Sequence, residues 1–206
     1  MIERIIVAAD GSQWEAAVLP QRAELVTVQS RSMPETAAAA AAVLPADSKI
    51  LFVCDDIPLL TAAAVQDFLQ QTEAVAAEAY YPVISEADCA RAFPGAKRTY
   101  VTLADGKFTG GNLMLLDAAV ISCGLAKAGD IFARRKKPWA LCGWLGFGFV
   151  VKFLLQRLTL ADVEKRASEL LGFKGKAVIS HYPEIGMDID KEEDWQLLEK
   201  YFKNSK

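Results

Sequence analysis

Histidine and closely spaced cysteine are scarce in this sequence, which excludes several kinds of site. The chain has one histidine, His181, and four cysteines, Cys54, Cys89, Cys123 and Cys142, with no CxxC pair. This spacing fits neither a zinc site nor a disulfide framework, so we expect a reducing, cytoplasmic location. A lone histidine before Tyr-Pro is more typical of a structural group than of a catalytic one. We identify no Ser/His/Asp or Cys/His set and no P-loop.

The sequence also lacks an unbroken hydrophobic run long enough to cross a membrane. Its most apolar window, 138–160, contains Lys152, Arg157 and three glycines, whereas a spanning helix needs about 20 apolar residues with few charges. The first ten residues contain too few apolar side chains for a secretory signal. We therefore expect no membrane span. The aromatic helices of 138–157 are either buried or lie against a membrane surface.

Charge of one sign does not dominate. The net charge is −3, from 23 basic and 26 acidic residues, and 52% of the residues are hydrophobic. This balance argues against nucleic acid as a partner and for a folded chain with a sizeable core. The basic run at 133–138 is interpreted as a solvated helix end. Because we find no internal repeat and no linker, we expect a single domain over 1–206.

Strand-like and helix-like segments alternate in the first third of the chain. We expect strands at 3–9, 23–28 and 49–53, and helices at 34–45 and 61–72. This alternation is typical of a parallel sheet with crossover helices. The strand at 49–53 is apolar without alternation, so we expect it to be buried on both faces.

The later part of the chain shows local signals for further elements. Asp105-Gly106 lies between two β-rich runs and predicts a hairpin over 98–112. Thr159 and Gly172 predict the beginning and the end of a helix. The other elements that we expect are strands at 79–85 and 176–180, helices at 86–93 and 192–202, and a strand followed by a helix over 112–129.

Two acidic clusters follow predicted strands. Asp55 and Asp56 come directly after the strand at 49–53, and MDIDKEED (187–194) follows the last strand. In open α/β sheets ligands bind at the carboxyl ends of the strands, and Mg²⁺ takes one or two carboxylates plus substrate phosphates. A cation site that joins Asp56 with Asp190 is one interpretation. The alternatives are a turn at Asp55-Asp56 and a helix cap at Asp190, paired with Glu193.

The segment TGGN offers flexible backbone and a polar side chain. Gly110 and Gly111 would let a ligand approach the backbone closely, and Asn112 offers both donors and an acceptor. A β-bulge or tight bend is the alternative. Arg98 either faces a phosphate or decorates a strand.

Three segments, 55–61, 97–117 and 185–195, together resemble the MobA-like NTP transferase (nucleotidyltransferase) family. More narrowly, they are similar to a bacterial branch labelled cobinamide-phosphate guanylyltransferase-like. The resemblance implies a three-layer α/β/α sandwich with a mostly parallel sheet, of the nucleotide-diphospho-sugar transferase type. It also implies an enzyme that joins an NMP from an NTP to a phosphorylated or hydroxylated small-molecule acceptor and releases pyrophosphate.

The resemblance also assigns roles to residues. Asp56 and Asp190 would be the catalytic, metal-binding groups that hold Mg²⁺ or Mn²⁺. The substrate-binding residues would be Asp55, Arg98, Gly110, Gly111 and Asn112, the last three on the acceptor side. Lys191-Glu192 replaces the Thr-Pro that the family places after the later carboxylate.

One family feature is missing from the sequence. The family opens with a strand and a glycine-rich LAGG-type loop that holds the NTP, whereas RIIVAADGS resembles its second strand. We therefore expect the first βα unit to be missing. One alternative is an N-terminally truncated, non-catalytic ligand-binding or regulatory homologue. Another is a nucleotide-sugar glycosyltransferase of similar fold, for which Asp55-Asp56 is a poor substitute for a spaced DxD.

Overall fold

The computed structural model describes residues 2–9, 23–28, 33–121, 124, 127, 145–192, 194–196 and 198–199. The chain divides into two compact units. The first combines Met1–Ile50 with Leu116–Leu141, and the second combines Leu51–Leu115 with Cys142–Lys206. The single domain over 1–206 stays a prediction.

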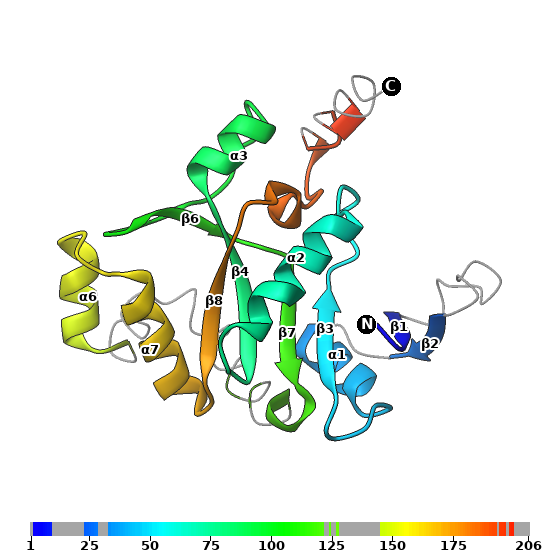
Figure 1. Ribbon diagram of the computed structural model, residues 1–206. Coiled ribbons are helices and arrows are strands. Elements are labelled where there is room, and N and C mark those ends of the chain that lie inside the picture. The colour runs from blue at the N-terminus through cyan, green and yellow to red at the C-terminus, as the bar shows by residue number, and fades with distance from the viewer. Residues whose placement is uncertain are drawn as a thin grey trace. The chain divides into compact units, whose positions relative to one another are not determined.

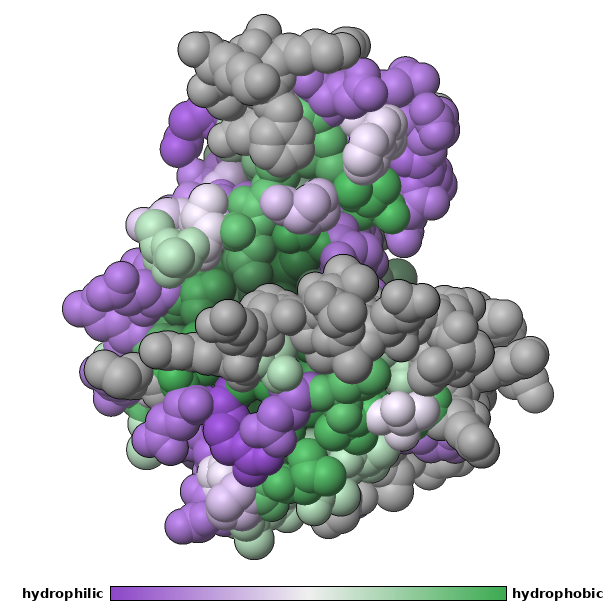
Figure 2. Space-filling model, turned by 90° about the vertical axis from the view of Figure 1, so that its right-hand side faces the viewer, coloured by the Kyte–Doolittle hydropathy of each residue, from purple (hydrophilic) through white to green (hydrophobic). Residues whose placement is uncertain are grey.

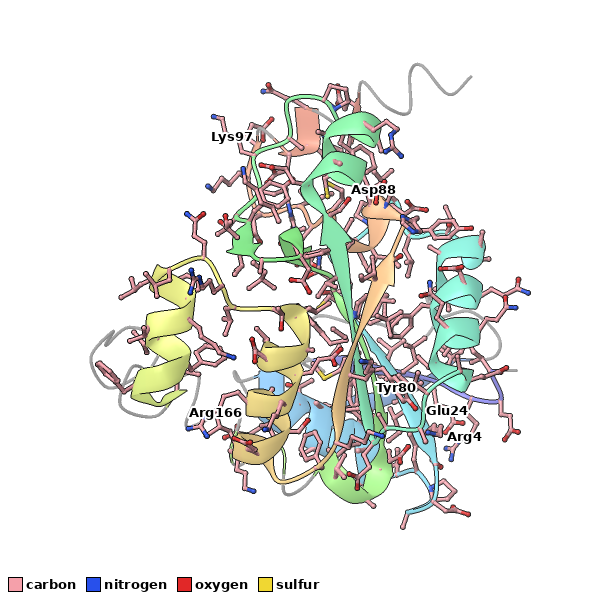
Figure 3. The ribbon with its side chains drawn as sticks, turned by 60° about the vertical axis from the view of Figure 1, so that its left-hand side comes forward. Arg4, Glu24, Tyr80, Asp88, Lys97 and Arg166 are labelled. Atoms are coloured by element: carbon pink, nitrogen blue, oxygen red, sulfur yellow. The ribbon has the colours of Figure 1, made fainter. Side chains whose placement is uncertain are left out.

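The first unit contains a two-stranded sheet. Its strands, β1 (Ile5–Ala9) and β2 (Ala23–Thr27), are parallel, with Ile5 opposite Ala23. Both lie within the predicted ranges, and helix α1 (Met33–Ala41) begins one residue before its predicted start. Beside the strands, the Arg4 guanidinium donates two hydrogen bonds to the Glu24 carboxylate (Figure 3), at 3.1 and 2.8 Å. Both side chains are exposed, so this pair contributes little to stability.

Six strands form the larger sheet (Figure 1). They are β3 (Lys49–Val53), β4 (Ala79–Ser85), β5 (Val101–Leu103), β6 (Gly106–Gly110), β7 (Leu113–Asp117) and β8 (Gly175–Ser180). Their order is β3-β7-β4-β6-β5, and β8 also pairs with β4. The hairpin predicted at Asp105-Gly106 is present, because β5 and β6 pair antiparallel with Leu103 opposite Gly106.

The larger sheet is mostly antiparallel, so the predicted three-layer α/β/α sandwich on a mostly parallel sheet is wrong. Strands β4 and β8 are parallel, but β6 is antiparallel to both β4 and β5. Two hydrogen bonds also show that β3 and β7 run in opposite directions. Cys54 N–H donates to the Asn112 carbonyl, and Ala118 N–H donates to the Ser48 carbonyl. One physical reason is that β5 and β6 are joined by a two-residue turn without a crossover helix, so the chain returns antiparallel.

The strand before the acidic pair is also less buried than its sequence predicted. The central residues of β3 are half-buried and its two ends are exposed, with Val53 at 45% exposure. A continuous apolar run is therefore compatible here with a partly exposed strand that pairs with the antiparallel β7.

Helices α2 (Ala62–Glu73) and α7 (Leu160–Leu171) cover opposite faces of the β4–β8 pair. Phe68 of α2 packs in a cluster with Ile84 and Val178. Val163 of α7 packs in another cluster, which contains Val83 and Ala177, the residues next to those two. Successive side chains of a strand point to opposite faces, so the two helices must lie on different sides. Figure 3 shows α7 and α2 flanking β8 on either side.

Caps predicted from the sequence fix the start of α2 and both ends of α7. Thr61 Oγ1 accepts the Ala64 N–H at 3.1 Å. Thr159 and Asp162 form a reciprocal capping box before α7. Gly172 then adopts a left-handed conformation, φ +81°, that is costly for residues with a Cβ. These local predictions are confirmed.

The remaining expectations concern helices. Strand β4 leads directly into α3 (Glu86–Ala92), near its predicted range. Helix α6 (Phe147–Leu154) falls within the predicted aromatic segment, whereas its part 138–144 and the basic run at 133–138 lie outside the described residues. Of the predicted last helix, residues 192, 194–196 and 198–199 are described as helical.

Exposed apolar residues do not by themselves mark a site in this chain. Within the described residues, no helix combines the length and the apolar character needed to cross a bilayer. On the face drawn in Figure 2, hydrophobic residues reach the surface between hydrophilic ones. Such exposure is common in folded proteins.

Candidate functional site

Backbone hydrogen bonds bring three distant segments of the second unit together. The Asn112 carbonyl accepts from Cys54 N–H at 3.0 Å, and Asn112 N–H donates to the Ile185 carbonyl at 2.9 Å. Ile189 N–H donates to the Asp56 carbonyl at 3.0 Å. The loop after β3 and the segment after the 3-10 helix Pro183–Gly186 are therefore held against each other by backbone hydrogen bonds, which do not depend on side chains.

Three carboxylates meet at this junction. Asp56, Asp188 and Asp190 each offer an oxygen, and these three atoms lie within 4.8 Å of one another. Asp56 and Asp188 are half-buried, and Asp190 is exposed. The structure thus brings Asp56 and Asp190 together and adds Asp188, while the exposed Asp55 is not a member of the group.

Asp56 is incompletely bonded. Its Oδ1 is buried and has no hydrogen-bond partner among the described residues. Burial raises the pKa of the Asp56 carboxyl, a hydrogen bond from its own backbone opposes this, and the charges of Asp188, Asp55 and Asp190 raise it further. An ionised carboxylate in such surroundings is costly unless a cation compensates it. Oxygen ligands of this kind suit a hard divalent cation such as Mg²⁺, so the donor set fits the predicted metal.

Cys54 lies beside the same carboxylates. Burial raises the pKa of its thiol, and the negative charges of Asp56, Asp55 and Asp188 raise it further. The thiolate is the form that attacks electrophiles and binds metals. These surroundings therefore disfavour the thiolate of Cys54.

Arg98 is paired with one of the three carboxylates. Its Nη1 donates to Asp188 Oδ1, and the two side chains are only 16% and 21% exposed. The sequence left open whether Arg98 faces a phosphate or decorates a strand. In the structure its guanidinium pairs with Asp188 and so neutralises part of the acidic group. A role of Arg98 in substrate binding stays a prediction.

A hollow of about 280 Å³ lies beside this pair. Its lining combines basic, acidic and hydroxyl side chains: Lys97, Arg98, Thr99, Thr109, Asp188, Asp190, Lys191 and Asp194. Lys97 is labelled in Figure 3. Basic and hydroxyl groups next to carboxylates can hold an anion beside a cation.

The glycines of TGGN are explained by packing. A Cβ at Gly110 would lie 2.3 Å from the Tyr81 hydroxyl, and one at Gly111 would lie 2.6 Å from Ile185 Cγ2. Neither distance is sterically tolerable without movement. The neighbouring Asn112 places a buried Nδ2 that has no partner among the described residues. An acceptor-side role for these three residues stays a prediction.

Asp194 provides the hydrogen bonds that the sequence suggested for a cap at Asp190. Its Oδ2 accepts from Asp190 N–H at 3.2 Å and from Lys191 N–H at 2.9 Å. The carboxylate of Asp190 is instead part of the group of three. The Glu193 side chain lies outside the described residues.

Asp188 is the residue that sequence reasoning missed. It precedes Asp190 by two positions in MDIDKEED, within a segment without helix or strand, 187–190. In an extended chain residues i and i+2 point to the same side. The Asp-Ile-Asp spacing was therefore a usable signal that two carboxylates, not one, face Asp56.

One comparison with known proteins is decisive. A hypothetical transferase structure from Thermus thermophilus matches with a TM-score of 0.76 and 35% sequence identity, over 90% of this chain and 77% of that chain. This chain belongs to the family of that protein. The relationship supports a transferase role in general. No protein-family model and no curated protein matches the sequence. The narrower MobA-like assignment stays a prediction.

Proposed function

We propose that this relative of the Thermus thermophilus hypothetical transferase is a nucleotidyltransferase that depends on Mg²⁺ or Mn²⁺. It transfers an NMP from an NTP to a phosphorylated or hydroxylated small-molecule acceptor and releases pyrophosphate. The reaction places charged phosphate oxygens against one another, so catalysis requires mainly positioning and charge neutralisation.

The observation that supports this proposal is the incompletely bonded Asp56 in a group of three carboxylates. Asp56 Oδ1 is buried without a partner among the described residues, and oxygens of Asp188 and Asp190 lie within 4.8 Å. A structural carboxylate would be expected to find donors, because unpaired buried charge is costly. A ligand carboxylate keeps an oxygen available for its cation.

The residues of the proposed site have different roles. Asp56, Asp188 and Asp190 would hold the metal, which supplies neutralisation of phosphate charge and orientation for in-line attack. Lys97 and Arg98, on the lining of the hollow, offer positive charge to an anionic substrate. The backbone hydrogen bonds through Asn112 hold the carboxylates in register. No covalent intermediate and no catalytic histidine are required.

The experiment is an assay of pyrophosphate release from each of the four NTPs, with Mg²⁺ and a panel of phosphorylated and hydroxylated acceptors. Asp56→Asn should lower the rate by at least about 100-fold while circular dichroism stays unchanged. Asp67→Asn is the matched control. Asp67 lies on α2 and accepts a hydrogen bond from Gln71 there, so this variant should keep the rate.

Three results would contradict the proposal. Release at near wild-type rates in Asp56→Asn would remove the metal assignment. Nucleotide binding without any pyrophosphate release, with every acceptor tested, would favour the non-catalytic homologue instead. Hydrolysis of a sugar nucleotide with Mn²⁺, without release from NTPs, would favour the glycosyltransferase.

A further inference from the structure

The guanidinium of Arg98 lies between two different environments. On one side, Nη1 donates to Asp188 Oδ1, an atom of the acidic group. On the other, Arg98 lines the hollow together with Lys97, Thr99, Thr109 and Lys191, and the carboxylates of Asp188, Asp190 and Asp194 also line it. A small movement of the Arg98 side chain would therefore let its guanidinium exchange Asp188 for an anion bound in the hollow.

Charge favours such an exchange. The three carboxylates carry three negative charges, and the guanidinium of Arg98 offsets one of them. A divalent cation offsets two and seeks oxygens of the same carboxylates. The attraction between Arg98 and Asp188 falls when the negative charge around Asp188 is neutralised. Arg98 and the metal are thus competitors for one group.

We propose, on the basis of the proposed function, that Arg98 takes the place of the cation at Asp188 while the site is free of metal. Binding of a divalent cation transfers Asp188 to the metal and frees the guanidinium. The freed guanidinium then holds a phosphate group in the hollow. The cation therefore binds before the phosphate, and Arg98 is a positioning residue for both.

The lining of the hollow fits a phosphate group. An arginine fork binds phosphate oxygens in bidentate geometry. Lys97 and Lys191 add positive charge, and the hydroxyls of Thr99 and Thr109 can donate. While Arg98 remains paired with Asp188, a carboxylate occupies its guanidinium, and the carboxylates of Asp190 and Asp194 also face the hollow. Phosphate should then bind weakly.

The first test measures Mn²⁺ affinity, by the electron paramagnetic resonance of the free ion, without nucleotide. Arg98→Met removes the competitor, so Mn²⁺ should bind about tenfold more tightly than in the wild type. Arg91→Met is the matched control, because Arg91 pairs with Asp88 outside the site, and it should leave the affinity unchanged. A purely structural role of Arg98 would leave the affinity unchanged or weaken it.

The second test measures binding of inorganic phosphate by calorimetry, with and without Mg²⁺. The wild type should bind phosphate at least about tenfold more tightly with Mg²⁺, and Arg98→Met should lose this gain. Asp188→Asn should bind phosphate without Mg²⁺, because its arginine is already released. A non-hydrolysable NTP added as competitor identifies the source: displaced phosphate indicates the NTP, and retained phosphate indicates the acceptor.

The outcomes separate the inference from the function on which it rests. If Asp56→Asn binds Mn²⁺ as tightly as the wild type, the metal site and this inference both fail. If Mn²⁺ binding depends on Asp56 but Arg98→Met does not tighten it, the exchange alone is wrong. The same holds if Asp188→Asn gains no phosphate binding. If Arg98→Met does not fold, the Asp188→Asn measurement decides.

Discussion

Two carboxylates of the second unit have opposite surroundings. Asp88 is only 9% exposed, yet its oxygens accept from Ser85 Oγ at 2.8 Å and from Arg91 Nη1 at 3.0 Å, and His181 Nδ1 lies 3.1 Å away. Figure 3 labels Asp88 at the start of α3. Asp56, which is less buried, keeps one oxygen without a partner among the described residues.

The pKa shifts of the two carboxyl groups follow this difference in hydrogen bonding: the pKa of Asp88 is lowered and that of Asp56 is raised. The hydrogen bond from Ser85 lowers the pKa of Asp88 against the effect of its burial, and His181 and Arg91 lower it further. Burial and neighbouring carboxylates raise the pKa of Asp56. Hydrogen-bond donors therefore explain Asp88 as part of the fold. Asp56 accepts a hydrogen bond from its own backbone, but its buried Oδ1 has no donor among the described residues, and a cation would compensate it.

The largest expected contrast is the response to metal. At a Mg²⁺ concentration 100 times its dissociation constant, the free energy of unfolding should rise by about 2.7 kcal/mol through ligand linkage. Asp88→Asn should show the same increase, and Asp56→Asn only a small part of it. Urea unfolding with Mg²⁺ and with EDTA measures the difference. An equal increase in all three proteins would place the bound cation elsewhere.

The next contrast concerns stability without metal. Asp88→Ala removes the partners of Ser85, Arg91 and His181, so the free energy of unfolding should fall by about 2 kcal/mol. Glu86→Ala is the control on the same helix, because Glu86 pairs with Lys107 at 44% and 51% exposure. It should cost no more than about 0.5 kcal/mol. Equal losses in urea unfolding would show that the Asp88 network has no special role.

The parts of the fold that depend on neighbouring residues were predictable from the sequence. Thr61 caps α2, and Thr159 with Asp162 and Gly172 bounds α7, because a cap is decided within one turn of the chain. The hairpin at Asp105-Gly106 follows from local turn chemistry for the same reason.

The direction of the strands was not predictable in this way. Strand β3 looked like a parallel, fully buried strand, but its partner β7 lies some 60 residues further on and runs antiparallel. An apolar run does not specify whether its partner is parallel, because the pairing depends on how a distant segment returns. The alternation of helices and strands before residue 73 was therefore not a sufficient basis for predicting a mostly parallel sheet.

The candidate site was predictable as residue types, and only partly as geometry. The prediction that Asp56 and Asp190 could meet assumed that the carboxyl ends of the two preceding strands share one edge of the sheet, and the two carboxylates do lie in one group. The pairing of Arg98 with Asp188 joins residues 90 positions apart. No local pattern of the sequence encodes that contact, because it forms only in the folded chain.

The smallest contrast is a difference in pH dependence, measured as the free energy of unfolding from pH 3 to 7 with EDTA. The pKa of Asp88 is lowered by folding, so its contribution is present above its unfolded pKa, about 3.9, and is lost as the pH falls below that value. The pKa of Asp56 is raised, so its ionisation destabilises the fold as the pH rises above about 3.9.

The two variants should therefore separate on either side of about pH 4. Asp56→Asn should become more stable than the wild type as the pH rises above this point, and the difference should level off once Asp56 is ionised in the folded protein. Asp88→Asn should be less stable than the wild type at neutral pH and approach it as the pH falls below this point. A stability difference for Asp56→Asn that arises only below about pH 4 would mean that Asp56 has donors after all, and the case for a cation beside it would lose its basis.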